Sequence, residues 1–144
     1  MTKTSSVFFL LGAVLVGAAY SSVGAQAPAG VNDGIYTAAQ ADRGKAVYAA
    51  NCAACHGDKL EGGGSGPELS GMGFTGGYKD GTAAALYIKI SQDMPSSAPG
   101  TLKPEEYADV LAYVLNVNKY PAGKTEIPKD GAGLKAVKMA APPK

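Results

Sequence analysis

The chain has 144 residues, enough for one domain with tails. Its 13 basic and 12 acidic side chains nearly balance, which argues against nucleic-acid binding, because that function favours a basic domain. Hydrophobic residues make up 46% of the chain but 20 residues are glycines, so we expect a modest core unless something else fills the centre.

The first 25 residues have the features of an export signal. Lys3 precedes an uninterrupted run of 13 apolar residues at 7–19. Val23 and Ala25 occupy the two positions that a signal peptidase recognises, so we expect cleavage after Ala25. A membrane-spanning helix needs about 18 apolar residues or more, so we expect a soluble exported protein, with an uncleaved membrane anchor as the alternative.

The first helix is expected to begin at Ala38, after an N-terminal extension at 26–37. Thr37 suits the N-cap position of this helix, and Gly44 and Tyr48 follow at helical spacing. Glycine inside a helix costs about 1 kcal/mol relative to alanine. We therefore expect close packing of another helix at Gly44, although a tolerated surface glycine is the alternative.

Cys52, Cys55 and His56 form the pattern C-x-x-C-H, which contains the only two cysteines and the only histidine of the chain. Two thiols at this spacing reach the two vinyl groups on one edge of a haem, where they form thioethers. The next residue then carries an imidazole to the iron as an axial ligand. The pattern predicts one haem c, bound covalently through Cys52 and Cys55, with His56 as a metal ligand.

Three other interpretations of this pattern fit the sequence less well. A structural zinc site needs four ligands, and the chain offers two cysteines and one histidine. A thioredoxin-like redox pair needs a preceding strand, whereas the segment before Cys52 is alanine-rich and predicted to be helical. A disulfide between Cys52 and Cys55 would be usual in an exported protein, but it gives no reason for a histidine directly after Cys55.

A glycine-rich loop is expected at 57–81, which holds ten of the 20 glycines. Glycine permits close approach of the backbone, so we expect this loop to wrap around the haem edge rather than to be merely flexible. Pro67 has a carbonyl but no N–H, and we expect that carbonyl to accept a hydrogen bond from His56, with an ordinary turn as the alternative. Phe74 and Tyr78 are expected to cover the ring or its propionates.

A short helix is expected at about 82–93, and the residue that follows it is a candidate for the second axial ligand. The only histidine is already used, so a methionine is expected there. Met94 lies 38 residues after His56, far enough to reach the opposite haem face, whereas Met72 follows only 16 residues after it and Met139 lies in the tail. We predict Met94 as the distal ligand, with Met72 or an open site as alternatives.

The clearest helical pattern lies at 104–118. Pro104 suits the first turn, and Lys103 stands where a capping serine or threonine is expected. An apolar stripe with helical spacing follows. Its residues are Tyr107, Val110, Leu111, Val114 and Leu115. No segment shows the alternation of apolar and polar residues that is typical of a strand, so the predicted fold class is all-α.

Residues 119–144 form a tail rich in lysine and proline, beyond the domain predicted at 38–118. The tail holds six lysines against two acidic residues, whereas residues 26–118 hold six basic and ten acidic side chains. Packing on the acidic body, free solvation and docking to a partner are all compatible with this composition. Scattered charge suits weak, salt-sensitive encounters between redox proteins.

Over about residues 38–118 the chain resembles the class I c-type cytochromes. Besides C-x-x-C-H, the resemblance rests on Gly66-Pro67-x-Leu69, on Met94-Pro95, and on Tyr107 and Tyr113 in the last helix. It implies an all-α class I cytochrome c fold, in which the N- and C-terminal helices cross while helices and loops enclose the haem.

The motifs and the resemblance together predict eight haem-binding residues, of which His56 and Met94 are the metal ligands. The eight are Cys52, Cys55, His56, Pro67, Leu69, Phe74, Tyr78 and Met94. Family members often carry a tryptophan near a propionate. This chain has none, so Tyr78 or Phe74 is expected to take that place.

A narrower resemblance, over 94–123, is to cytochromes that accompany periplasmic quinoprotein dehydrogenases. The motif and the supply of axial ligands predict an electron carrier, not an enzyme, and we expect a monomer without stable membrane insertion after signal cleavage. The carrier would accept electrons from such a dehydrogenase in the periplasm and pass them to an oxidase or another cytochrome. The alternatives are a haem gas sensor or peroxidatic enzyme with an open distal site, and a fixed subunit of a larger enzyme.

Overall fold

The computed structural model describes residues 28–144, so the predicted export signal at 1–25 lies outside the described part of the chain. The described residues contain helices and two isolated bridges but no strand, which confirms the all-α prediction. The elements are a 3-10 helix at Val31–Asp33, α1 at Ala38–Asn51, α2 at Ala53–His56, α3 at Gly71–Tyr78, α4 at Ala83–Asp93 and α5 at Pro104–Val117. None of the helices in this part of the chain has the length and apolar character needed to span a membrane.

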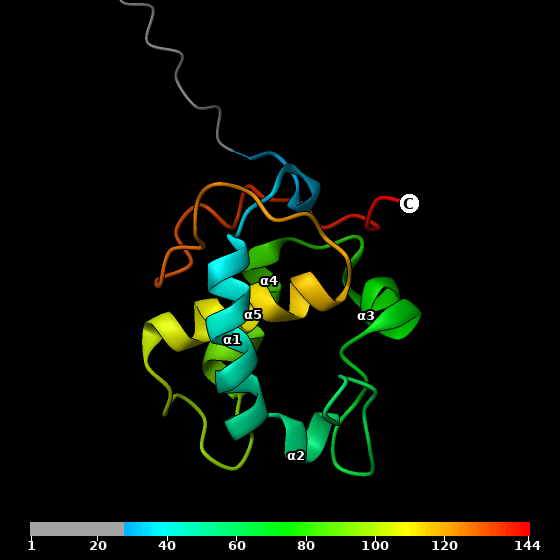
Figure 1. Ribbon diagram of the computed structural model, residues 1–144, viewed down its shortest axis with the longest axis vertical. Helices are drawn as coiled ribbons and strands as arrows, with labels where there is room; N and C mark the ends of the chain where they lie inside the picture. Colours follow the sequence, from blue (N-terminus) through cyan, green and yellow to red (C-terminus); the bar gives the residue numbers. More distant parts are fainter. Residues whose placement is uncertain (1–27) are drawn as a thin grey trace, which may run out of the picture.

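Helices α1 and α5 cross at the centre of the molecule (Figure 1) and make its most extensive interhelical contact. Gly44 lies at this crossing, where a Cβ atom would stand only 1.8 Å from the carbonyl oxygen of Asp109. One turn further on, the rings of Tyr48 and Tyr113 pack with their centroids 5.3 Å apart. The expectation of close packing at Gly44 is therefore confirmed.

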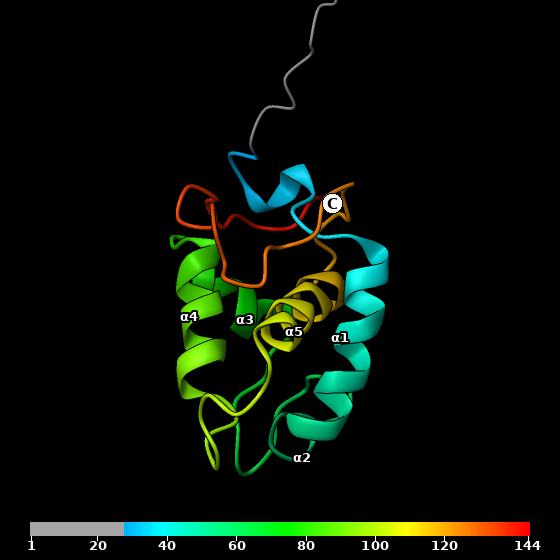
Figure 2. The same cartoon turned by 90° about the vertical axis from the view of Figure 1, so that its left-hand side faces the viewer.

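Helix α5 lies between α1 and α4 (Figure 2), so both sides of its apolar stripe are covered. All five predicted stripe residues are at most 4% exposed. At the start of the helix, the carboxylate of Glu106 accepts a hydrogen bond of 2.8 Å from the backbone N–H of Lys103. This bond ties down the entry to the helix although no serine or threonine occupies the capping position.

The prediction of a continuous loop at 57–81 is wrong for residues 71–78, which form helix α3. Four of the eight residues in α3 are glycines, so intrinsic propensity disfavours the helix. Packing outweighs this cost, because Phe74 is only 2% exposed and its ring packs on that of Tyr78 with centroids 5.1 Å apart. The Thr75 hydroxyl also donates to the carbonyl of Gly71 at 3.0 Å.

The tail at 119–144 lies across one end of the molecule, beside the segment that precedes α1 and opposite α2 (Figures 1 and 2). The backbone N–H of Val31 donates to the carbonyl of Lys138, and that of Ala83 donates to the carbonyl of Val137, both at 2.9 Å. Five hydrophobic side chains of the tail are buried: Tyr120, Ile127, Leu134, Val137 and Met139. Of the three possibilities for the tail, the structure therefore shows packing on the body.

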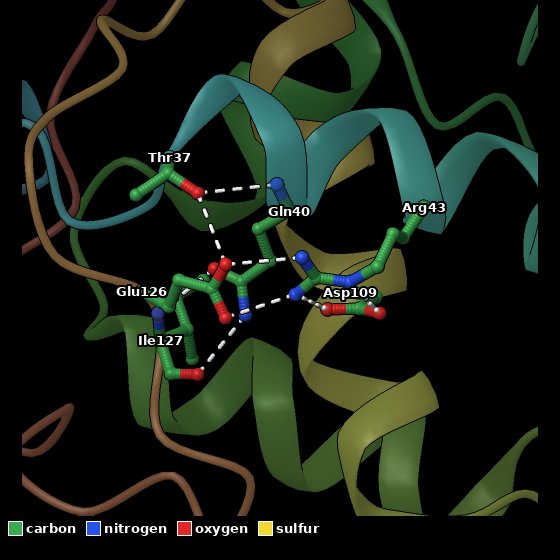
Figure 3. Close-up of polar contacts among 6 residues, drawn as sticks. All are labelled: Thr37, Gln40, Arg43, Asp109, Glu126 and Ile127. Atoms are coloured by element: carbon green, nitrogen blue, oxygen red, sulfur yellow. Dashed lines mark hydrogen bonds and ion pairs between the residues drawn. The ribbon is translucent and has the colours of Figure 1, made fainter.

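A polar network joins the tail to both crossed helices (Figure 3). The Arg43 guanidinium donates to both carboxylate oxygens of Asp109, at 3.0 and 2.9 Å, and also to Glu126 in the tail. The buried Gln40 side chain donates to the carbonyl of Ile127 at 3.0 Å and accepts from its N–H at 2.8 Å. The network fixes the tail against α1 without placing an unpaired polar group in the core.

We expect Glu126→Gln to lower the free energy of unfolding at pH 7 by less than about 1 kcal/mol, because the ion pair with Arg43 is exposed and screened. The hydrogen bond from Arg43 lowers the pKa of the Glu126 carboxyl below its usual 4.5. The stabilisation is therefore complete above the unfolded-state pKa and is lost as the pH falls through the folded-state value.

Urea unfolding of the two proteins at pH 7 and at about pH 3 tests this expectation. The difference should shrink at the lower pH, and also in about 1 M salt at pH 7, where exposed charges are screened. A difference that is unchanged by both conditions would mean that Glu126 acts through something other than its charge.

Candidate haem-binding site

A cavity with mostly apolar walls lies at the centre of the fold, and residues from all five α-helices line it. The eight side chains that the sequence predicts to bind haem all belong to this lining. They are Cys52, Cys55, His56, Pro67, Leu69, Phe74, Tyr78 and Met94. Residues that are up to 42 positions apart in the chain thus converge on one space.

The two cysteines reach this cavity from one helical turn at the start of α2. The backbone N–H groups of Cys55 and His56 both donate to the carbonyl of Cys52, at 3.1 and 3.0 Å. The two thiols are free, so they do not form the disulfide that was one alternative. Burial, helped by the nearby Cys55, raises the pKa of the Cys52 thiol to about 11.

His56 is held in one orientation by the loop that follows α2. Its ring Nδ1 lies 2.8 Å from the carbonyl oxygen of Pro67, and the residue is only 9% exposed. Because a carbonyl can only accept, Nδ1 carries the proton and Nε2 keeps a lone pair for a metal. Gly66 makes this approach possible, since a Cβ there would stand 3.0 Å from the imidazole and 2.9 Å from the carbonyl oxygen of Cys55.

Of the methionines at 28–144, Met94 alone lines the cavity. It is the C-terminal cap of α4, with extended backbone angles, and its side chain is half-buried. Met72 lies on α3 with 90% of its surface exposed. Met139 is buried elsewhere, as part of the tail, where its N–H donates to the carbonyl of Gly81 at 2.9 Å.

The sequence did not assign several other residues to the cavity. Four apolar residues of α4 and α5 line it: Leu86, Ile90, Val110 and Val114. In each helix the two residues are four positions apart, and this spacing was the sequence signal that could have placed them on one buried face. Tyr48 and Lys89 also belong to the lining, together with Asn51, Ala54, Pro95, Ser96 and Ser97.

Two of these unassigned residues have polar groups with partners at the cavity wall. The Tyr48 hydroxyl donates to the carbonyl of Gly57 at 2.8 Å, and burial raises the pKa of this phenol. The Lys89 ammonium pairs with the carboxylate of Asp93 one helical turn on, at 2.8 Å. The spacing of Lys89 from Asp93 predicts a surface ion pair but gives no sign that the lysine borders a cavity.

The chemistry of this lining fits a haem. Apolar walls suit the porphyrin, two thiols on one turn suit thioether attachment, and an oriented imidazole and a thioether are the usual axial donors of cytochromes c. The imidazole comes from α2 and the thioether from the end of α4, so the two donors enter the cavity from different elements.

Comparisons with known proteins agree with this chemistry. Residues 39–114 match the family described as cytochrome c oxidase, cbb3-type, subunit III. Over 74 residues the chain is 34% identical to a protein of Synechocystis sp. named cytochrome c-553-like, a match that covers 51% of this chain and 66% of that relative.

Among solved structures, the chain is similar to the sulfane dehydrogenase SoxCD from Paracoccus pantotrophus, with a TM-score of 0.52 and 23% identity. The match covers 69% of this chain and 52% of that one, and at this identity it supports the fold alone. The family match spans more than half of the chain and includes the C-x-x-C-H turn. The chain therefore belongs to the family described as cytochrome c oxidase, cbb3-type, subunit III, and is a class I c-type cytochrome with one covalently bound haem c.

Proposed function

We propose that this cytochrome is an exported electron carrier in which His56 and Met94 are the axial ligands of the haem iron. The observation that carries the proposal is that both side chains border the same apolar cavity as the two cysteines. When bound, the haem supplies an iron that changes between the ferric and ferrous states.

The chain's own residues favour electron transfer over ligand chemistry. The Pro67 carbonyl holds the His56 ring in place and increases its strength as a donor. The Met94 thioether would occupy the position that a gas or peroxide needs, and methionine ligation raises the reduction potential. Apolar side chains of α4 and α5 line the cavity and offer water few hydrogen-bond partners. These features support a carrier rather than the gas sensor or peroxidatic enzyme with an open distal site.

We further propose a periplasmic location and a quinoprotein-type dehydrogenase as the electron donor, with an oxidase or another cytochrome as acceptor. The charge and apolar pattern of residues 1–25 supports export. The resemblance of 94–123 to cytochromes that accompany such dehydrogenases supports the donor. The uneven charge of body and tail suits brief encounters between partners.

The cofactor and ligands are tested on protein purified from the producing cells. Intact mass should correspond to a chain that begins at Gln26 and carries one haem, and the ferric protein should have the weak far-red band of a sulfur-to-iron bond. The reduced protein should resist carbon monoxide. Rapid carbon monoxide binding together with the absence of that band would instead support an open distal site.

The donor is tested by following reduction of the ferric cytochrome after a purified quinoprotein dehydrogenase and its substrate are added. Reduction should require both the dehydrogenase and its substrate, and should slow as ionic strength rises. If the reduction rate equals that seen without the dehydrogenase, that donor class is wrong, whereas the assignment as a haem carrier is unaffected.

A further inference from the structure

We propose that Tyr107 is a positioning residue that keeps the loop carrying Met94 closed against the cavity. The inference rests on the proposed ligation by Met94. The Tyr107 hydroxyl donates to the carbonyl oxygen of Met94 at 3.2 Å and accepts from the backbone N–H of Leu102, also at 3.2 Å. One side chain of α5 therefore binds both ends of the loop at 94–102.

The loop has few other polar ties to the body of the protein. Its own hydrogen bonds are local, from the N–H of Ala98 to the carbonyl of Pro95 at 2.9 Å and from the Thr101 hydroxyl to the carbonyl of Ala98 at 2.8 Å. Residues 96–101 are all exposed. Apart from the bonds of α4 itself, Tyr107 makes the hydrogen bonds that join 94–102 to the rest of residues 28–144.

The Tyr107 ring is anchored well enough to serve as this fixed point. It is 4% exposed and lies in the first turn of α5, the helix packed between α1 and α4. Its hydroxyl has both a donor and an acceptor partner, so the phenol has one preferred orientation. Movement of the loop away from the cavity would break both bonds while the ring stays buried.

The consequence for function follows from a two-state equilibrium. When the loop opens, the Met94 sulfur would leave the iron and expose the sixth position to outside ligands. The apparent affinity for such a ligand is its intrinsic affinity multiplied by the fraction of molecules that are open. By holding the loop closed, Tyr107 lowers that fraction and keeps the cytochrome an electron carrier.

The experiment measures imidazole binding to the ferric holoprotein, because imidazole competes with the thioether for the iron. Loss of the hydroxyl in Tyr107→Phe should raise the apparent imidazole affinity about 5- to 30-fold, the range expected when one or two modest hydrogen bonds are lost. The matched control is Tyr120→Phe. Its hydroxyl donates to the carbonyl of Ala140 within the tail, at 2.8 Å, so this variant should lose stability without a change in imidazole affinity.

A second measurement separates loop opening from general destabilisation. In Tyr107→Phe, hydrogen exchange of the Leu102 N–H should accelerate by a similar factor. The interior amides of α5, such as that of Leu111, should exchange only as fast as the global stability of the variant allows, as they do in the control.

The outcomes distinguish this inference from the function on which it rests. A far-red band in the wild type combined with unchanged imidazole affinity in Tyr107→Phe would overturn the role of Tyr107 and leave Met94 ligation intact. Absence of that band in the wild type would overturn Met94 ligation and, with it, the closed loop as described. An equal gain of affinity in Tyr120→Phe would also refute a specific role for Tyr107.

Discussion

Gly44→Ala is expected to lower the free energy of unfolding by about 3 kcal/mol, because the crossing of α1 and α5 leaves no room for a Cβ. The added methyl would lie 1.8 Å from the carbonyl oxygen of Asp109, 2.4 Å from its carbonyl carbon and 3.0 Å from the Cβ of Tyr113. Two of these atoms belong to the backbone of a buried helix, so rotation of a side chain cannot relieve the clash. The gain in helix propensity, about 1 kcal/mol, is too small to compensate.

The matched control is Gly76→Ala, in helix α3, where nothing lies within 4 Å of the new Cβ. There alanine should be neutral or slightly stabilising, since it only restricts the unfolded chain. Urea unfolding of the two holoproteins and the wild type provides the comparison. Equal stability of Gly44→Ala and wild type would mean that the helices do not cross as closely as described.

Gly44 also illustrates what the sequence could predict about the fold. A glycine within a strongly helical pattern has a cost that usually reflects a close contact, and the contact was found. The apolar stripe likewise predicted the bounds of α5, because apolar residues at helical spacing indicate both that a helix forms and which of its sides is buried. In both cases the signal lay in the local pattern of residues, although the contact at Gly44 is with a different helix.

Helix α3 was missed because its cause is not local. Glycine content predicted a loop, but Phe74 and Tyr78 are four residues apart and both border the haem cavity, so a helical turn lets them pack together. That benefit depends on a wall of the cavity formed by other elements. The sequence of residues 71–78 alone carries no information about that wall.

The sequence left the position of the tail undecided for a similar reason. Its lysines were compatible with packing on the acidic body, with free solvation and with docking to a partner. In the structure, buried apolar residues such as Ile127 and Val137 alternate with the lysines and anchor the tail. In α1, Gln40 donates to the backbone carbonyl of Ile127 and Arg43 donates to the carboxylate of Glu126. No sequence spacing relates α1 to residues 126 and 127. In the candidate site, likewise, the motif indicated the cysteines and the histidine, whereas the wall positions of Tyr48 and Lys89 depend on the tertiary fold.

Met94→Ala is expected to convert the carrier into a ligand-binding haem protein. Without the thioether the far-red band should disappear, and the apparent affinity for imidazole should rise by about 100-fold or more, because the sixth position no longer has to open. The midpoint potential should fall by on the order of 0.1 V, since methionine ligation raises it. Visible spectra, imidazole titration and potentiometry on the holoprotein measure the three effects.

Met72→Ala is the control for this change. Its side chain is 90% exposed on α3 and does not line the cavity, so the band, the imidazole affinity and the potential should all remain those of the wild type. A Met94→Ala protein that retains the band, or a Met72→Ala protein that loses it, would show that the ligand has been assigned to the wrong methionine.

Combining the two site variants separates the ligand from the residue that positions it. If Tyr107 acts only by holding the Met94 loop, Tyr107→Phe should change imidazole affinity in the wild-type background but not in Met94→Ala, where no thioether remains to be displaced. The two effects would then be strongly non-additive. Additive effects would mean that the hydroxyl alters access to the iron by a route independent of Met94, such as the width of the cavity mouth. The double variant therefore tests whether the two hydrogen bonds of Tyr107 act through the sulfur.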